Sequence, residues 1–415
     1  MGERILDADI DYANDFIKMI CTTIGPGCPC SPQERARAMK VKEEMEKSMD
    51  DVHYEEFTCA PTAFLKWLQP AALLAVAAIA SFYLSLDPAK AVFLSIIAFM
   101  IAKFIFLLMI FEFGLTREVI DVLYPRKKSA NIIGKLGPNS GEELRHVILF
   151  CGHHDSVLQF TWLRYLKFGY YIAIGILFAG VIYLTALLGI RLFTLLAGIQ
   201  VTWVITQLIV FSCSLLPAIF VIGMFFTERG KEGGSVPGAI DNLSAVSLVL
   251  AMGRIVMRNP DLIPPNTEIR FISFGCEEAG VRGSMNYVRS HLAELREKDA
   301  VCFNFESIHE PEITIFSSDC NGFVQHDREL VSSVADAAIV AGVPFLIKPM
   351  LFGGGNTDAM KFSASHIKAL SLFGLKLPAD MVAFYHQNTD NYDKVNVEAL
   401  KNALKIAVTY LQRSK

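Results

Sequence analysis

The stretch HVILFCGHHDS, residues 146–156, decides how the fold of this chain is understood. Its mainly apolar beginning predicts a buried strand, and His153 and Asp155 follow where that strand ends. In α/β folds, binding residues gather at the ends of strands. From residue 168 onward the chain becomes almost purely hydrophobic. A candidate metal ligand therefore precedes a predicted membrane segment by only a few residues.

The composition is typical of a membrane protein that also has a water-soluble part. Of the 415 residues, 53% are hydrophobic and only 19% are charged. An ordinary soluble domain has about 25% charged residues, and the apolar excess here is concentrated in a few blocks. The net charge of −4, without a basic patch among aromatics, predicts no nucleic-acid partner.

Four apolar blocks predict membrane-spanning helices, because a span needs about 20 apolar residues. They are residues 68–86, 91–115, 168–190 and 193–226. The last block is longer than one span requires but too short for two spans and a turn. It is either one long helix kinked near Pro217 or a span followed by an interfacial piece.

The blocks form two hairpins, so the polar stretches between them should share one compartment. LDPAK (86–90) joins the first pair, and only Arg191 and Leu192 separate the second. The predicted organisation is a soluble domain in three pieces, 1–61, 116–167 and 227–415, interrupted by hairpins at 62–115 and 168–226. Basic residues flank the blocks mainly on the soluble side, which predicts a multi-pass protein with four spans and a cytoplasmic soluble domain.

Lys103 lies near the middle of the second block. A charged side chain at that depth is costly, so we expect Lys103 to face the bundle interior or a water-filled cavity.

The cysteines do not predict a disulfide framework. There are nine, an odd number, and their spacing is irregular, which favours reduced thiols. Cys-Pro-Cys at 28–30 is too tight for a zinc knuckle and predicts a turn.

Beyond residue 227 the chain alternates strand-like and helical patterns. Residues 267–274 and 300–305 predict buried strands, and 242–256 and 284–298 predict amphipathic helices. This alternation predicts an α/β layered domain.

Residues suited to binding metal follow the apolar runs. They are His153, Asp155, Asp241, Glu277, Glu278, Glu306 and His386. Imidazole and carboxylate donors without a thiol suit an open, hydrolytic zinc site. Of two adjacent carboxylates, one can bind metal while the other handles a water proton, and one carboxylate can bridge two ions.

The motifs H-x-D-S, G-A-x-D-N, E-E-x-G-x-x-G-S, N-x-E and Y-H-x-x-x-D occur in this order. Together they resemble the co-catalytic di-zinc aminopeptidase family of peptidase clan MH, which includes leucine aminopeptidases and glutamate carboxypeptidase. The resemblance covers the first 60 residues loosely, then SANIIGKL, HVILFCGHHDS and the chain from 236 onward. It implies a three-layer α/β/α fold around a central mixed, mostly parallel sheet, into which the four membrane helices are inserted.

The resemblance also implies two zinc ions and the role of each site residue. The ligands of one ion are then His153, Asp241 and Glu306, and those of the other are Asp241, Glu278 and His386. Glu277 matches the general acid/base, Asp155 the partner of His153, and Tyr385 the residue that stabilises the oxyanion. The implied reaction is peptide hydrolysis, with aminopeptidase action as the default, and the substrate is a peptide.

Two departures from the family pattern concern a metal ligand and the substrate side of the site. Glu306 stands where the closest relatives often carry Asp. The segment GGGNTDAM (353–360) differs from the usual family sequence there, so Asp358 is expected to help shape a substrate subsite.

Two other functions fit the same fold. One is an inactive receptor or scaffold, which would have lost ligands or the base. The other is a single-zinc acyltransferase of the glutaminyl-cyclase type, which a zinc count per chain would distinguish. The membrane blocks beside the metal motif favour hydrophobic or membrane-derived peptides as substrates.

The H-x-D spacing selects His153 as the ligand, and we expect the side chain of His154 to point elsewhere. Because His153 and Asp241 must reach one ion, the interval between them must cross the bilayer an even number of times. Block 193–226 therefore counts as one span.

Overall fold

The computed structural model describes residues 4–137, 143–199, 201–214, 234–351 and 354–414. Internal contacts divide the chain into two compact units. The first, here called the sheet unit, comprises Met1–Pro61, Arg126–Gln159 and Gly230–Lys415; the second, the helical unit, comprises Thr62–Pro125 and Phe160–Arg229. Residues 116–125 and 160–167, which the sequence assigns to the soluble domain, therefore group with the membrane blocks.

In the described residues, nine strands form one mixed sheet. Its order is β1 (Asp51–Cys59), β2 (Lys127–Leu136), β4 (Thr267–Phe274), β3 (His146–His153), β5 (Val301–Glu306), β9 (Lys368–Phe373), β6 (Ile313–Asp319) and β7 (Val324–Gln325), with β8 (Phe345–Pro349) paired to β6. The central neighbours β4, β3, β5 and β9 are parallel, whereas the pairings β1–β2, β2–β4, β6–β9 and β6–β7 are antiparallel. The sheet is thus parallel at its centre with antiparallel pairings on both sides, and β8 pairs with β6 in parallel.

Alternating side chains give the sheet two apolar faces. Along β3, Ile148 and Phe150 join one buried cluster, while Val147, Leu149 and Cys151 join another. This period of two is what a strand buried on both faces requires.

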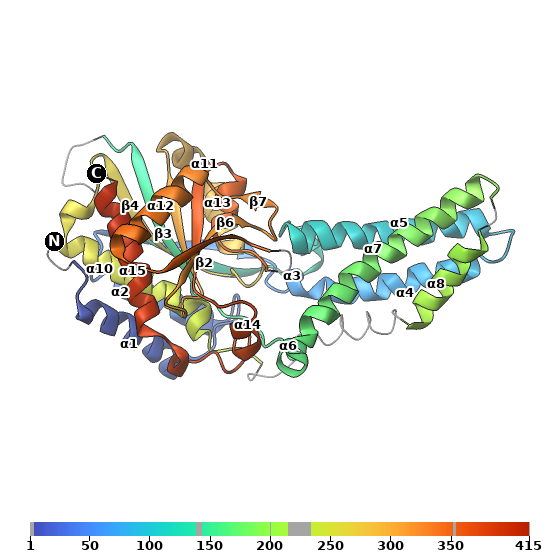
Figure 1. The fold of residues 1–415 in the computed structure, drawn as a ribbon, viewed down its shortest axis with the longest axis horizontal. Helices are drawn as coiled ribbons and strands as arrows, with labels where there is room; N and C mark the ends of the chain where they lie inside the picture. The colour runs from blue at the N-terminus through green and yellow to red at the C-terminus, as the bar shows by residue number, and fades with distance from the viewer. Residues whose placement is uncertain (1–3, 138–142, 200, 215–233, 352–353, 415) are drawn as a thin grey trace. The chain divides into compact units, whose positions relative to one another are not determined.

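Helices cover both faces, which gives the three-layer α/β/α arrangement that the resemblance implies (Figure 1). The first face is covered by α1 (Asp7–Thr23), α2 (Pro32–Met45), α10 (Ser244–Arg258), α12 (Arg328–Ala341) and α15 (Val397–Arg413). The second is covered by α11 (Arg282–Glu297) and α13 (Ala359–Ala364). The strands predicted at 267–274 and 300–305 and the helices predicted at 242–256 and 284–298 are confirmed within two residues.

The helical unit follows the predicted apolar blocks. Its helices are α3 (Ala63–Lys66), α4 (Leu68–Leu84), α5 (Ala91–Leu108), η1 (Met109–Gly114), η2 (Asp121–Leu123), α6 (Thr161–Leu166), α7 (Gly169–Leu196) and α8 (Thr202–Ser214). Within this unit α5 packs against both α4 and α7, and α7 packs against α8. Ala63–Leu84, Ala91–Gly114 and Gly169–Leu196 are long and apolar enough to cross a membrane.

The boundary predicted at Arg191 and Leu192 is wrong. Helix α7 continues through both residues to Leu196, so block 193–226 begins inside it. Only α8 of that block is described further, and it is shorter than a span. Pro217, where a kink was predicted, lies outside the described residues.

A fourth helical stretch, Ala239–Arg258, also has the length and hydropathy of a span. It is, however, 89% buried within the structure, compared with 44% or less for the three stretches of the helical unit. Its helix α10 packs on β3, β4 and β5, so it is a core helix of the sheet unit.

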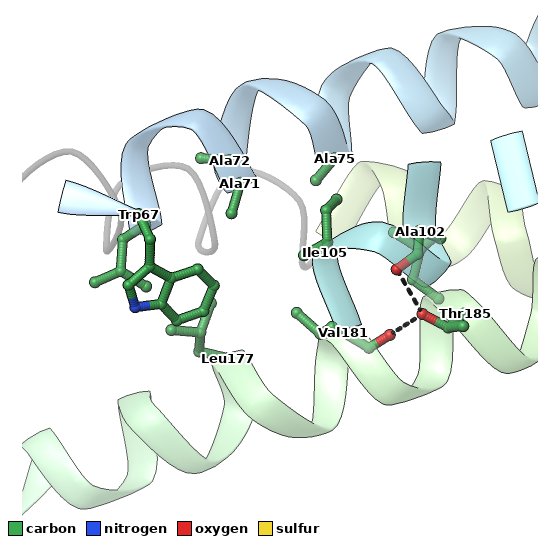
Figure 2. Close-up of a pocket in the computed structure, with 11 residues that line it drawn as sticks. Trp67, Ala71, Ala72, Ala75, Ala102, Ile105, Leu177, Val181 and Thr185 are labelled. Atoms are coloured by element: carbon green, nitrogen blue, oxygen red, sulfur yellow. Dashed lines mark hydrogen bonds between the residues drawn. The ribbon is translucent and has the colours of Figure 1, made fainter. Parts of the chain in front are cut away.

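Small residues allow the helices of the helical unit to approach closely (Figure 2). Ala71, Ala72 and Ala75 of α4 line a cavity of only about 20 Å³ together with Trp67. Across it, the Thr185 hydroxyl donates to the Ala102 carbonyl at 3.2 Å, in addition to the Val181 carbonyl of its own helix. Small residues and interhelical hydrogen bonds are typical of helix packing in membranes.

The prediction that Lys103 faces the bundle interior is wrong. Its side chain is exposed on α5 and does not face the interior of the bundle. The neighbouring Ala102 takes the interior position.

Candidate metal centre

The carboxyl ends of three adjacent parallel strands bring the first site residues together. His153 is the last residue of β3, Glu306 is the last residue of β5, and Glu277 and Glu278 follow the end of β4. Since β3 lies between β4 and β5, these side chains emerge at the same edge of the sheet.

Two further residues reach this edge from loops. Asp241 lies in the short turn η3 (Ala239–Leu243) before α10, and His386 follows α14 (Ala379–Ala383). The backbone N–H groups of Ile240 and Asp241 donate to the Asp390 carboxylate at 2.8 and 3.1 Å. Asp390 therefore fixes the turn that presents Asp241.

Two triads of donor atoms share Asp241. His153, Asp241 and Glu306 form one, and Asp241, Glu278 and His386 form the other. In the first, His153 Nε2 lies 3.4 Å from Asp241 Oδ1 and 3.7 Å from Glu306 Oε1. In the second, His386 Nε2 lies 3.1 Å from Asp241 Oδ2 and 3.4 Å from Glu278 Oε1. Each oxygen of Asp241 thus faces a different triad.

These residues fit zinc. Nitrogen and oxygen ligands at zinc distances of about 2.0–2.2 Å lie about 3.4 Å apart in a tetrahedral shell, close to the separations seen here. His153 Nε2, Asp241 Oδ2 and Glu278 Oε1 are buried without a hydrogen-bond partner among the described residues. Buried polar atoms need a partner, and metal ions would supply it.

Asp155 connects a ligand to the catalytic loop. Its Oδ1 lies 3.3 Å from His153 Nδ1, and its carboxylate accepts the backbone N–H groups of Glu277 and Glu278, both at 3.0 Å. A carboxylate in this position fixes the orientation and tautomer of a ligand imidazole.

Burial and neighbouring charge shift the pKa values of the carboxylates. Burial is the main cause that raises the pKa of Glu277 well above its usual value, with Glu278 adding to it and His153 opposing it. Burial also raises the pKa of Glu278 to about 7. A raised pKa in a glutamate is compatible with general acid/base work.

Tyr385 and Asp358 also lie at the site. The Tyr385 ring stacks on the His386 ring with centroids 3.8 Å apart. Asp358 is fully buried, and burial raises its pKa to about 7 while the charges of His153 and Glu306 act on it. Its role in substrate binding remains a prediction.

His154 does not reach either triad. Its Nδ1 lies 2.9 Å from the Ser273 hydroxyl, and burial lowers the pKa of its imidazole to about 4. This agrees with the expectation that His154 points elsewhere.

The sequence analysis missed Arg37, which holds three loops of the site. Its fully buried guanidinium donates to the carbonyls of Gly25, His154 and Pro237 at 2.7–3.1 Å. A signal was present, since Arg37 shares the spacing of the buried Val41 and Met45 on one face of α2.

A cavity of about 600 Å³ in the sheet unit extends from Tyr385. Its apolar lining comprises Phe316, Leu346, Met350, Leu351, Phe373, Leu375, Leu377 and Met381, and Glu310, Glu312, Lys348 and Lys376 also border it. Concave, mainly apolar sites with a few polar groups are typical of ligand pockets.

Residues 225–411 match the model of Peptidase family M28. This segment includes Asp241, Glu277, Glu278, Glu306 and His386, but not His153. Aminopeptidase YwaD of Bacillus subtilis (strain 168) is 30% identical over 172 residues, which are 40% of this chain and 35% of that protein. The chain therefore matches about a third of the length of this curated relative.

Solved structures share the fold over nearly the whole chain. A zinc aminopeptidase from Bacillus subtilis superposes with a TM-score of 0.54 at 15% identity, covering 98% of this chain and 94% of that one. A glutaminyl cyclase from Porphyromonas gingivalis gives 0.56 at 12% identity, covering 98% of each chain. The mixed α/β fold of zinc aminopeptidases is thus confirmed.

Proposed function

We propose that this protein is a membrane-embedded, zinc-dependent metallopeptidase, and specifically an aminopeptidase. The observation that carries the proposal is the pair of buried donor triads that share Asp241. All five proposed ligands converge there, and the base candidate Glu277 has its Oε2 only 3.6 Å from His153 Nε2. A scaffold that had lost catalysis would not need to keep this complete set.

The chain's own residues perform the proton transfers. Two bound zinc ions would activate a water and polarise the scissile carbonyl. Glu277, whose carboxylate lies beside the first triad, takes the proton of the attacking water and passes it to the leaving amine. Tyr385 stands beside His386 at the cavity and donates a hydrogen bond to the developing oxyanion.

The cavity beside Tyr385 supports peptides with bulky apolar residues as substrates. Its size and its apolar lining suit a large hydrophobic side chain. Peptides left by the cleavage of membrane proteins have this character. If short hydrophilic substrates were cleaved far better than apolar ones, this part of the proposal would fail.

The membrane arrangement rests on the apolar helices and the basic residues that flank them. We propose four spans, the fourth formed by the part of block 193–226 that follows α7, together with two zinc ions per chain and a cytoplasmic sheet unit. In sealed right-side-out vesicles, an added protease should spare the sheet unit until the membrane is permeabilised. Digestion of the sheet unit before permeabilisation would contradict this orientation.

A glutaminyl-cyclase-type acyltransferase is the second candidate, because such a structure shares the fold. The second triad, which includes Glu278 and His386, favours the peptidase. Two zinc ions bound by the site support the peptidase, and one supports the cyclase.

The test combines a peptidase assay with metal analysis on the full chain in detergent. Glu277→Gln should keep the metal content of the wild type and lower kcat/KM by about 10²–10⁴-fold, because it removes the general base. Glu297→Gln, an exposed change on α11, is the matched control and should leave activity unchanged. Wild-type activity in Glu277→Gln would disprove the mechanism, and a blocked substrate amino terminus that leaves cleavage unchanged would exclude aminopeptidase action.

A further inference from the structure

Three cysteine sulfurs converge outside the His/carboxylate centre. Cys30 Sγ lies 3.4 Å from Cys276 Sγ and 3.7 Å from Cys59 Sγ, and all three sulfurs lie within 4.8 Å of one another. Cys59 and Cys276 are fully buried, whereas Cys30 is half-buried. The three thiols therefore form one cluster with access to solvent on the Cys30 side.

The cluster is assembled from three separate parts of the sheet unit. Cys30 lies in the turn before α2, Cys59 ends β1, and Cys276 lies in the loop after β4, directly before Glu277. Cys30 and Cys276 both have backbone angles in the left-handed region, with φ of 59° and 54°. This conformation is costly for residues other than glycine and is often found where a site requires it.

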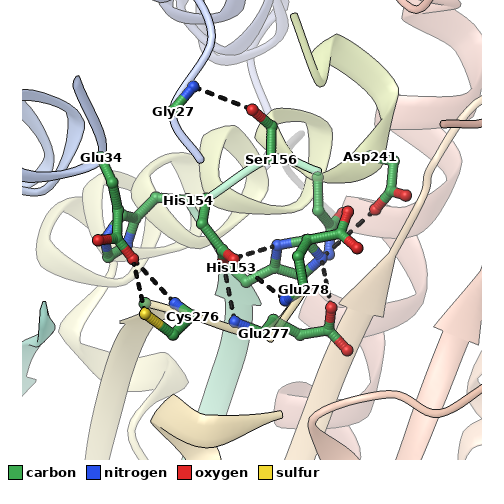
Figure 3. Close-up of polar contacts among 12 residues, drawn as sticks. Gly27, Glu34, His153, His154, Ser156, Asp241, Cys276, Glu277 and Glu278 are labelled. Atoms are coloured by element: carbon green, nitrogen blue, oxygen red, sulfur yellow. Dashed lines mark hydrogen bonds and ion pairs between the residues drawn. The ribbon is translucent and has the colours of Figure 1, made fainter. Parts of the chain in front are cut away.

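The Glu34 carboxylate accepts hydrogen bonds from two of the three cysteines. Its carboxylate accepts the backbone N–H of Cys30 at 2.6 Å. It also accepts the backbone N–H of Cys276 at 2.9 Å, and Glu34 Oε1 lies 3.3 Å from Cys276 Sγ (Figure 3). The Ser129 hydroxyl also donates to it at 2.8 Å. Outer-shell hydrogen bonds of this kind fix the ligands of metal sites.

We propose that Cys30, Cys59 and Cys276 bind one zinc ion as thiolates, separate from the ions of the His/carboxylate centre. Zinc–sulfur bonds of about 2.3 Å place sulfurs about 3.8 Å apart in a tetrahedral shell, close to the spacing of this cluster. Three thiolates favour a soft or borderline metal. The fourth position opens toward solvent beside Cys30.

The bound ion joins the N-terminal turn and the end of β1 to the loop that carries Glu277 and Glu278. It stabilises the folded state, because an ion that binds only the folded chain adds RT ln(1 + [Zn²⁺]/Kd) to stability. This inference does not depend on peptidase activity.

Cobalt substitution tests the proposal with a signal that the His/carboxylate centre cannot give. The full chain, kept reduced in detergent and loaded with Co²⁺, should show a thiolate-to-cobalt charge-transfer band in the near ultraviolet. Cys30→Ser, the least buried of the three positions, should lose this band. Cys21→Ser, a half-buried cysteine of α1 outside the cluster, is the matched control and should keep it.

Alkylation followed by mass spectrometry gives a second readout that needs no variant. Zn²⁺ should protect Cys30, the half-buried thiol of the cluster, from a thiol reagent, while Cys21 reacts equally with and without the metal. A charge-transfer band that persists in Cys30→Ser would overturn the proposal. Equal alkylation of Cys30 with and without zinc would do the same.

Discussion

The His/carboxylate centre and the thiol cluster meet at one loop, residues 276–278, and they differ in donor chemistry and in construction. The first gathers imidazole and carboxylate groups at the carboxyl ends of parallel strands. The second gathers thiols from a turn, a strand end and a loop. Imidazole and carboxylate ligands suit a hydrolytic centre, whereas three thiolates favour a soft or borderline metal. Neighbouring residues of one loop can therefore belong to two sites with different donor atoms, Cys276 to the thiol cluster and Glu278 to the His/carboxylate centre.

Metal removal should separate the two centres most strongly. A chelator should lower peptidase activity by at least about 10³-fold, because bound metal supplies several kcal/mol of transition-state stabilisation. Added zinc should restore the activity. Cys30→Ser should lose peptidase activity on chelation and regain it with added zinc, as the wild type does. If added zinc did not restore the peptidase activity of Cys30→Ser, the thiol cluster would take part in the chemistry.

Asp155→Asn should weaken the His/carboxylate centre alone. The change removes the charge beside His153 Nδ1 and one of the two oxygens that accept the loop N–H groups. Loss of such a partner typically costs about 10–100-fold in metal affinity or activity. Zinc titrations monitored by activity would measure the shift, and the cobalt–thiolate band should stay. An unchanged zinc affinity and activity would contradict the role of Asp155.

Met381→Asp should change substrate choice without affecting either metal centre. Met381 lines the cavity beside Tyr385, and an added charge there disfavours an apolar side chain. We expect kcat/KM for apolar substrates to fall about 10–100-fold relative to small hydrophilic ones. A parallel fall for both classes would show that the cavity does not select the substrate.

An ion pair away from both centres gives the smallest effect and serves as a reference. Arg270 donates to the Glu294 carboxylate, which lowers the pKa of Glu294 to about 2. A lowered folded pKa contributes stability that is present above the unfolded value of about 4.3 and is lost as pH falls toward 2. Because Glu294 is partly exposed, Glu294→Gln should cost about 1 kcal/mol or less near pH 7.

Thermal unfolding of both proteins across pH measures this reference. The gap between variant and wild type should narrow as pH falls below about 4. A stability difference that stays constant with pH would contradict the lowered pKa of Glu294. Zinc content should be the same in both proteins.

The His/carboxylate centre was predictable because its residues follow strands that the sequence reveals. The apolar residues of 267–274 predict the strand β4, and those of the run before His153 predict β3. Once those strands are parallel neighbours, their ends must meet. Asp390, which accepts the backbone N–H groups of the Asp241 turn, occurs in the motif Y-H-x-x-x-D, but the motif alone did not predict this contact.

The thiol cluster was not predictable from spacing. Cys30 is 29 residues from Cys59 and 246 from Cys276, and two of the three take left-handed backbone angles that no local pattern announces. The same limit applies to helix ends. Arg191 looked like a hairpin turn, but a lone Arg one turn before the end of α7 can extend its side chain toward the interface.

The most direct test of the central claim is the number of zinc ions lost when the shared ligand is removed. Zinc per chain would be measured in Cys30→Ser, where the thiol cluster is disabled, with and without Asp241→Ala. Because Asp241 faces both triads, the account predicts that Asp241→Ala loses about two ions. The loss of one ion, or of none, would contradict it.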